Sequence, residues 1–241
     1  MKKQYCAAVS SLIPENIAVR LSREFELIFL PPDEKIDKPV STHPDMIMTI
    51  LEGHVFVPES YYAAYPDVIG KISSLGGMIP VLSEAYRDKI YPNDVSLNTL
   101  TVGKILLCRK KSASPELLEF AEKDGYTVLD TKQGYAGCSC IAAYDSVVTS
   151  DKGILSLLTD NGIDEEFVPG DNIRLEGYNH GFIGGCGGFW GGKLYLFGRD
   201  NGEVESFAKK RGYGVVYLSD EKLTDWGGIK FFEKKQECGN V

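Results

Sequence analysis

The sequence has 241 residues and a formal net charge of −8, with hydrophobic residues at 43% and charged residues at 25%. This composition is typical of a globular protein with a packed core and excludes a disordered or fibrous chain. The net negative charge disfavours binding to phosphate backbones and to anionic lipid, so neither nucleic acid nor a membrane is expected as a partner.

The first residues resemble the start of a secretory signal without its continuation. Met1 to Lys3 could form the charged region, but Gln4 to Ile13 is short and mixed, and Pro14 follows without a convincing cleavage site. No apolar run of about 18 residues occurs. The six cysteines are scattered through a chain too large to need disulfides, which is typical of reduced thiols. We therefore expect a cytoplasmic protein.

In chain order, the first predicted elements are a helix over Pro14–Arg23 and a strand over Phe25–Leu30. A strand follows at His54–Val57, then a helix with an apolar face that ends at Gly77. Another strand is expected at Met78–Leu82. The order of this second group is strand, helix, strand.

The clearest group begins with a strand over Gly103–Cys108. A helix follows, with Ser114 as its N-cap and Pro115 at its first position, and it stops at Gly125. The next strand is Tyr126–Leu129. The same order recurs over 145–168, with a helix capped by Asp151, and over 193–218, with a helix capped by Asn201.

The glycines that end these helices recur about every 45 residues, which indicates a repeat architecture. The N-terminal helix and strand, joined to a C-terminal strand near Gly228–Phe232, supply a fifth unit. The pattern predicts an α/β fold in one domain spanning 1–241, a closed pseudo-fivefold ring of strand-strand-helix-strand repeats, or β/α propeller. The expected repeats are 38–92, 93–133, 134–179, 180–224, and 225–241 joined with 1–37.

An open doubly wound α/β sheet is the alternative, because strands that alternate with helices generally form parallel units. An extra strand before each group argues against it. These leading strands are rich in small residues, as strands converging on an axis need to be. They are expected at Pro44–Ile50, Leu97–Val102, Ser139–Ala143 and Phe182–Phe189.

Polar residues that composition does not explain lie around the leading strands. They are His43, Asp45, Asn98, Cys138, Cys140, Tyr178, Asn179 and His180. In a ring of repeats, positions at one end of such strands converge although about 45 residues separate them. Arg174 lies nearby and could bind an anion such as a substrate carboxylate. We expect a site in the central channel.

The five-unit order, the segment Gly134-Tyr135-Ala136-Gly137-Cys138 and the triplet His43-Pro44-Asp45 resemble the pentein superfamily, which includes guanidino-group-modifying enzymes. The likeness covers nearly the whole chain and is closest to an uncharacterised branch. It implies a cysteine thiolate that attacks a guanidinium carbon, a histidine from an H-x-D/E motif as acid and base, and carboxylates that hold the cation.

Carried onto this sequence, the resemblance implies Cys138 as nucleophile, His43 as acid and base, and Asp45 as the partner of the guanidinium or of His43. A neighbouring histidinium would be needed to favour the thiolate at neutral pH. In the family the histidine motif lies in the third repeat and the cysteine in the fifth. Here they fall in the first and third, so the offset of two repeats is kept, and the fifth has no cysteine before Cys238.

Structural roles for the same residues stay open. His43 could end an extended segment and Asp45 could cap a turn. Cys138 and Cys140 are placed on one strand, where buried free cysteines are common core residues, so at most one is expected to act. A Cys-x-Cys pair without a second close pair is a weak metal pattern, and no metal or cofactor is expected.

Two functions remain open. The first is a cysteine-dependent hydrolase or amidinotransferase acting on a guanidine or amidine C–N group. Its catalytic residues would be Cys138, His43 and Asp45, and its substrate-binding residues Asn98, Arg174, Tyr178, Asn179 and His180. The second is a noncatalytic module that binds a small molecule or a protein. A small-molecule ligand is expected, with a cation favoured by the acidic balance; the sequence leaves the oligomeric state open.

Overall fold

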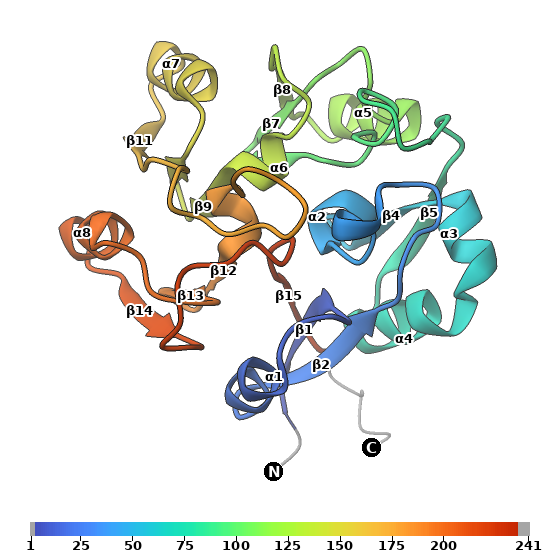
Figure 1. The fold of residues 1–241 in the computed structure, drawn as a ribbon. Helices are drawn as coiled ribbons and strands as arrows, with labels where there is room; N and C mark the ends of the chain where they lie inside the picture. Colours follow the sequence, from blue (N-terminus) through green and yellow to red (C-terminus); the bar gives the residue numbers. More distant parts are fainter. Residues whose placement is uncertain (1–2, 236–241) are drawn as a thin grey trace, which may run out of the picture.

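The computed structural model describes residues 3–235 and contains five separate three-stranded sheets. Figure 1 shows the sheets spread around a common centre, with the longer helices on the outside. The open doubly wound alternative is wrong, because no hydrogen-bonded ladder joins one of these sheets to another in the described part of the chain.

Each sheet repeats one topology. A leading strand pairs antiparallel with a middle strand, and a third strand pairs parallel with the middle one. The sheets are β3 (Thr49–Leu51), β4 (His54–Pro58) and β5 (Ile79–Ser83); β6 (Leu100–Val102), β7 (Ile105–Cys108) and β8 (Thr127–Asp130); β9 (Cys140–Ala143), β10 (Ser146–Thr149) and β11 (Asp164–Phe167); β12 (Gly187–Trp190), β13 (Lys193–Leu196) and β14 (Gly214–Tyr217); and β15 (Lys230–Glu233), β1 (Tyr5–Ser10) and β2 (Phe25–Leu30).

The two ends of the chain share one sheet. β1 pairs antiparallel with β15, with Tyr5 opposite Glu233, and parallel with β2. The prediction of a fifth unit built from both ends is therefore confirmed, although β1 itself was not predicted. Cys238 lies outside the described residues.

Helices link the middle and third strands: α1 (Glu15–Leu21), α3 (Glu59–Ala64), α4 (Pro66–Gly76), α5 (Pro115–Lys123), α7 (Lys152–Asp160) and α8 (Glu203–Lys210). The caps of α5 and α7 are confirmed, because Ser114 Oγ and Asp151 Oδ1 accept the backbone N–H of the third helical residue. Asn201 is not the cap of α8. Asp200 Oδ2 accepts the N–H of Val204 there, at 2.7 Å. Among the residues described, no helix is long and apolar enough to cross a membrane.

The predicted leading strands begin later than expected. Helical turns occupy the first part of three of them: α2 (Pro44–Ile47), α6 (Ala136–Ser139) and a 3₁₀ turn over Ile183–Cys186. Pro44 suits the first helical position. The turn of α6 is held by a side chain from another unit, described below, and this contact leaves no periodic signal in the sequence.

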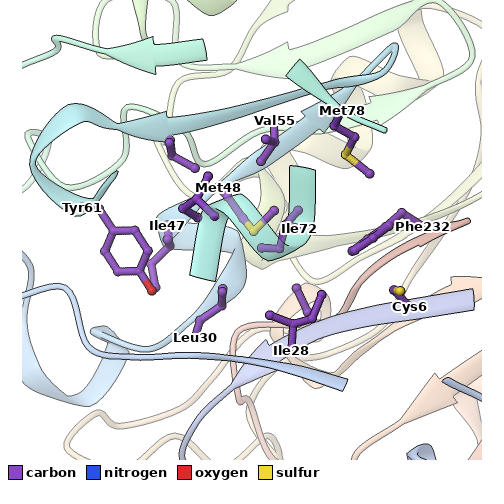
Figure 2. Close-up of a cluster of buried hydrophobic side chains, with 13 residues drawn as sticks. Cys6, Ile28, Leu30, Ile47, Met48, Val55, Tyr61, Ile72, Met78 and Phe232 are labelled. Carbon is purple, nitrogen blue, oxygen red and sulfur yellow. The ribbon is translucent and has the colours of Figure 1, made fainter. Parts of the chain in front are cut away.

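One buried cluster joins the terminal sheet to the sheet β3–β5 (Figure 2). Phe232 of β15 and Ile28 of β2 pack in it with Ile72 of α4 and Val55 of β4. Burying side chains of this size removes about 1.5–3 kcal/mol each of unfavourable hydration. The cluster therefore holds the C-terminal strand against the first sheet along the chain.

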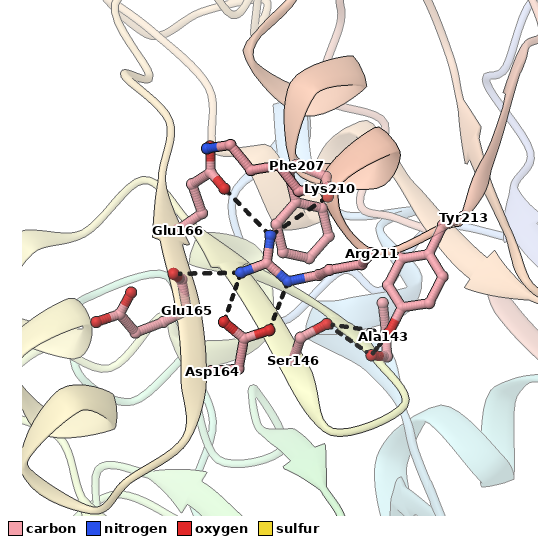
Figure 3. Close-up of polar contacts among 9 residues, drawn as sticks. All are labelled: Ala143, Ser146, Asp164, Glu165, Glu166, Phe207, Lys210, Arg211 and Tyr213. Carbon is pink, nitrogen blue, oxygen red and sulfur yellow. Dashed lines mark hydrogen bonds and ion pairs between the residues drawn. The ribbon is translucent and has the colours of Figure 1, made fainter.

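Arg211, just after α8, ties the sheet β12–β14 to the sheet β9–β11 (Figure 3). Its guanidinium donates to both oxygens of Asp164 at 2.6 Å and to Glu166 Oε2 at 3.1 Å, both on β11. The group also lies over the Phe207 ring, 4.2 Å from its centroid. Such a bidentate, stacked arrangement is specific to arginine.

Candidate functional site

Residues from four of the five units meet at the centre of the molecule. His43 and Asp45 lie at the start of α2, Asn98 two residues before β6, Cys138 in α6, and Asp225 in the segment before β15. All five side chains are buried, with exposed fractions of 5% or less. Each stands ahead of a leading strand, so the repeated topology itself brings them together.

Asn98 holds the Cys138 thiol in place. Its Oδ1 accepts the backbone N–H of Gly137 at 2.7 Å and of Cys138 at 3.2 Å. Its Nδ2 donates to the Asp45 carbonyl at 3.1 Å and to Cys138 Sγ at 2.9 Å. Residue 137 must be glycine here, because a Cβ would lie 2.9 Å from the Thr99 carbonyl oxygen. Asn98 thus fixes α6 and α2 relative to each other.

His43 is paired with Asp225, a residue that the sequence analysis did not single out. The distance from His43 Nδ1 to Asp225 Oδ1 is 3.6 Å. Asp225 also accepts the backbone N–H groups of Phe182 and Gly227, each at 3.0 Å. Burial lowers the pKa of His43, and the Asp225 carboxylate opposes that effect. The place of Asp225 in the repeat could have pointed to it from the sequence, because Asp225 precedes the last leading strand as Asp45 precedes the first.

Ionisation of the Asp45 carboxyl group and of the Cys138 thiol is unfavourable. Burial, together with the Asp225 charge, raises the pKa of Asp45 to about 7. Neither of its carboxyl oxygens has a hydrogen-bond partner within the described part of the chain. Burial first, and then the charges of Asp45 and Asp225, raise the pKa of Cys138 well above its ordinary value. The thiol is therefore protonated at neutral pH.

The histidinium expected beside the thiol is not found. Among residues 3–235 the thiol of Cys138 has Asn98 and the Met46 sulfur as hydrogen-bond partners, and His43 is not one of them. Because burial lowers the pKa of His43, its imidazole is neutral at pH 7. Thiolate formation at this site needs another source of positive charge.

A cavity of about 270 Å³ opens onto the thiol, and we call it the front cavity. Its lining includes His43, Cys138 and Asp225, together with the consecutive residues Tyr178, Asn179 and His180. Stacked rings of Tyr135 and Phe182, with centroids 5.9 Å apart, form an aromatic wall. The remaining lining residues are Val40, Met46 and Leu175. The cavity thus combines an aromatic wall with a carboxylate, which suits a flat cation.

Other residues named from the sequence lie elsewhere. Asn98 is behind the thiol rather than in the cavity. Arg174 lines a larger neighbouring cavity of about 610 Å³, which shares His43 and Asp225 with the front cavity. Cys140 begins β9 and is a core residue, with its Sγ 3.2 Å from Thr149 Oγ1. Burial raises its pKa to about 12.

The expectation that Cys138 and Cys140 lie on one strand is wrong, because Cys138 lies on the helical turn before β9. Among residues 3–235, no group of three or more His, Cys, Asp or Glu side chains is arranged to hold a metal ion. The site is built from a thiol, an imidazole, two carboxyl groups and an amide.

Several solved structures superpose on most of this chain. A dimethylarginine dimethylaminohydrolase, solved as an adduct with 4-chloro-2-hydroxymethylpyridine, superposes with a TM-score of 0.56 at 11% identity, over 90% of this chain and 92% of that one. The enzyme of the same name from Pseudomonas aeruginosa, complexed with citrulline, gives 0.54 at 11% identity over the same shares. Inosamine-phosphate amidinotransferase from Streptomyces griseus gives 0.51 at 14% identity, over 93% of this chain and 79% of that one.

These likenesses show that the chain has the pentein fold, and the resemblance drawn from the sequence is confirmed at that level. Residues 8–230 match the family described as a family of unknown function (DUF6873), and the chain belongs to it. No curated protein matches the sequence.

Proposed function

We propose that this protein is a cysteine-dependent enzyme that breaks a C–N bond of a guanidino or amidino compound, as a hydrolase or an amidinotransferase. The observation that carries the proposal is the convergence of a buried thiol and a histidine–carboxylate pair on one cavity. The printed names of the structural neighbours, a dimethylaminohydrolase and an amidinotransferase, support the same reaction class.

The charge of the site favours a cationic substrate. Asp45 and Asp225 lie near Cys138, and both raise the pKa of its thiol. A guanidinium or amidinium in the front cavity would offset these carboxylates and lower the pKa of the thiol. The substrate would then supply the positive charge that His43 does not. Tyr178, Asn179 and His180 are the proposed contacts along the cavity wall, and Arg174 is a proposed contact for a distal anionic group.

The proposed reaction has two steps. Cys138 Sγ attacks the amidinium carbon while its proton passes to a carboxylate, and the C–N bond breaks as the departing amine takes that proton from the carboxyl group. A water molecule, or an amine in a transferase, then attacks the same carbon and gives a proton to His43. The C–S bond breaks as His43 returns this proton to the sulfur, and the thiol is regained. His43, neutral and paired with Asp225, suits the second step as a base.

The proposal includes the remaining features expected from the sequence. The five sheets act as one closed pseudo-fivefold ring in a single domain over 1–241, and the substrate is a small cation taken from the cytoplasm. A noncatalytic binding module is the second candidate. It is favoured by the raised pKa of Cys138 and by the absence of a hydrogen bond from its thiol to His43 among residues 3–235.

The test uses 2-chloroacetamidine, whose amidinium mimics the substrate cation and whose chloride is displaced by a thiolate. The native protein should form a thioether at Cys138, located by mass spectrometry, and should release amine or ammonia from at least one compound in a panel of guanidines and amidines. Cys138→Ser should lose turnover about 10³-fold or more, because it removes the nucleophile. Cys140→Ser is the matched control and should keep it.

Two outcomes would contradict the proposal. One is a folded native protein in which 2-chloroacetamidine leaves Cys138 unmodified up to pH 9.5. The other is turnover that survives in Cys138→Ser. Binding of panel compounds without any turnover would favour the binding module instead.

A further inference from the structure

The larger cavity beside the front cavity, of about 610 Å³, enters the proposed reaction only through its Arg174 contact, and we call it the side cavity. Three residues line both cavities: His43, Leu175 and Asp225. Cys138 lines the front cavity and not the side cavity. The two cavities therefore meet at the histidine–carboxylate pair and not at the thiol.

The segment 174–180 runs between the two cavities. Residues 174–177 line the side cavity, and residues 178–180 line the front cavity. The segment is held to the first unit at two points. The Tyr178 hydroxyl donates to Asp37 Oδ2 at 2.8 Å, and Gly177 lies so close to Pro39 that a Cβ would be 2.9 Å from the proline Cγ. The segment thus forms a fixed partition between the cavities.

The passage between the cavities is narrow where they meet. His43 is 2% exposed and Asp225 is 3% exposed, although each of them lines both cavities. Gly227 packs directly against the histidine, because a Cβ at residue 227 would lie 2.2 Å from the His43 Cβ. A passage packed so closely suits a single terminal nitrogen atom better than the carbon chain of a long substrate.

The chemistry of this meeting point suits an amine. The Asp225 carboxylate attracts an ammonium ion, and the neutral imidazole of His43 can take a proton from an attacking amine. With His43 Nδ1 turned toward Asp225 Oδ1 at 3.6 Å, Nε2 is the ring nitrogen left to accept that proton. Water as the nucleophile would need neither the carboxylate to attract it nor a cavity of about 610 Å³.

The rest of the side cavity suits the body of such an amine. It has apolar side chains that can contact a carbon chain, and it has charged side chains in which cations outnumber acids, apart from Asp225 at the meeting point. The apolar side chains are Leu12, Ile17, Phe197 and Trp226, the cations are Lys38, Arg174 and Lys222, and the acids are Glu176 and Glu221. The side cavity can therefore hold an apolar chain with an anionic end.

We propose that the side cavity binds the acceptor of an amidino group, a primary amine with an apolar chain and an anionic end. The protein is then an amidinotransferase with separate sites for donor and acceptor. The inference rests on the proposed function of Cys138 and chooses between its two reaction types.

The transfer step balances without a further reactant. The acceptor attacks as the free amine, after its ammonium form has released a proton to bulk water. The amine nitrogen bonds to the amidino carbon held on Cys138, and one N–H proton passes to His43. The C–S bond breaks as His43 gives this proton to the sulfur. The product is an N-substituted guanidine or amidine.

The test measures transfer from a donor that the native protein turns over to isotope-labelled 4-aminobutanoate, 6-aminohexanoate and hexylamine, by mass spectrometry. Native protein should form the amidinated amine faster than it hydrolyses the donor, and should prefer 6-aminohexanoate to hexylamine. Asn16→Trp, which fills the side cavity from an exposed position, should raise the KM for 6-aminohexanoate about tenfold or more, and so should Arg174→Met. The KM for the donor should stay within about twofold. The matched control is Glu15→Trp, at an exposed neighbour outside the cavity.

Hydrolysis of the donor without transfer to any of the three amines would overturn the inference. So would a tenfold rise in the KM for the donor in Asn16→Trp, because it would place part of the first substrate in the side cavity. A second measurement does not depend on turnover: calorimetric binding of 6-aminohexanoate to Cys138→Ser, which should weaken about tenfold when Asn16→Trp is added. Absent binding, or equal binding in both proteins, would also overturn the inference. If no donor is turned over, the proposed function fails, and this binding still decides on the amine site.

Discussion

Asp45 is a carboxyl group buried at a position where it gains no hydrogen bond from residues 3–235. Its pKa is about 7 in the folded chain, against about 4 for an ordinary aspartate. The folded state therefore binds this proton more tightly than the unfolded state. The associated stability is complete below about pH 4 and is lost as the pH rises through about 7.

Asp45→Asn should accordingly raise the free energy of unfolding at pH 8, by roughly 1 to 4 kcal/mol, because the amide avoids a buried negative charge. The gain should shrink as the pH falls toward 4. Urea unfolding at several pH values measures it, with the exposed Asp171→Asn as the matched control. A variant that is equally or less stable than the native protein at pH 8 would contradict the assignment.

The Asp225 carboxylate opposes the lowering of the His43 pKa by burial, and this pairing can be tested directly. Asp225→Asn removes the carboxylate that raises the pKa of the imidazole, so the NMR titration of His43 should move to lower pH. The sequence has three histidines, which makes the assignment practical. Asp220→Asn, a change at an exposed aspartate, should leave the His43 titration in place, and an equal movement in both variants would argue against the pairing.

At the scale of elements, Asn98 joins the segment before β6 to α2 and α6. Asn98→Ala would leave the amides of Gly137 and Cys138 and the Asp45 carbonyl without their partner. Each unsatisfied buried group costs about 1–3 kcal/mol, so for three such groups we expect a loss of roughly 3 kcal/mol or more in the free energy of unfolding. The matched control is Asn93→Ala, since Asn93 bonds to Asp88 near the surface and should cost about 0.5 kcal/mol or less.

Asn98→Ala should also change the chemistry of the site. Its Nδ2 donates to Cys138 Sγ, and this hydrogen bond lowers the pKa of the thiol. Slower alkylation of Cys138 in a folded variant is therefore expected. Alkylation at the native rate would show that Asn98 acts on the fold alone.

At the scale of the whole molecule, the ends of the chain meet in one sheet, and Phe232 of that sheet packs in the cluster with Met78 and Val55. Phe232→Ala should cost about 3–5 kcal/mol, because it empties a core position. Phe29→Ala is the matched control and should cost much less in the free energy of unfolding, because Phe29 is 45% exposed.

If residues 1–241 form one domain, Phe232→Ala should lower the urea midpoint of the entire protein. Circular dichroism and tryptophan fluorescence would then report a single shared transition, because the five sheets of one domain unfold together. Two transitions, with only the earlier one affected, would contradict the single-domain proposal.

The sequence by itself determined the repeated units and their helix ends. The Ser114 and Asp151 caps, the glycine after each helix and the join between the two termini depend on local patterns or on their regular recurrence. The same recurrence predicted that Cys138 and His43 would line one cavity. These features follow from residues close in the chain or from equivalent places in successive units.

Only the tertiary structure decided the electrostatics of the site. Asp225 acts on His43 and Cys138 from a distant part of the chain, and its effect depends on burial, which no local pattern encodes. The helical turn that carries Cys138 likewise exists because Asn98 satisfies its amides from another unit. Hydrogen bonds between units and the loss of solvent arise only when the sheets assemble. For that physical reason the sequence indicated a thiolate beside a histidinium, whereas the folded protein places a neutral thiol near the carboxyl groups of Asp45 and Asp225.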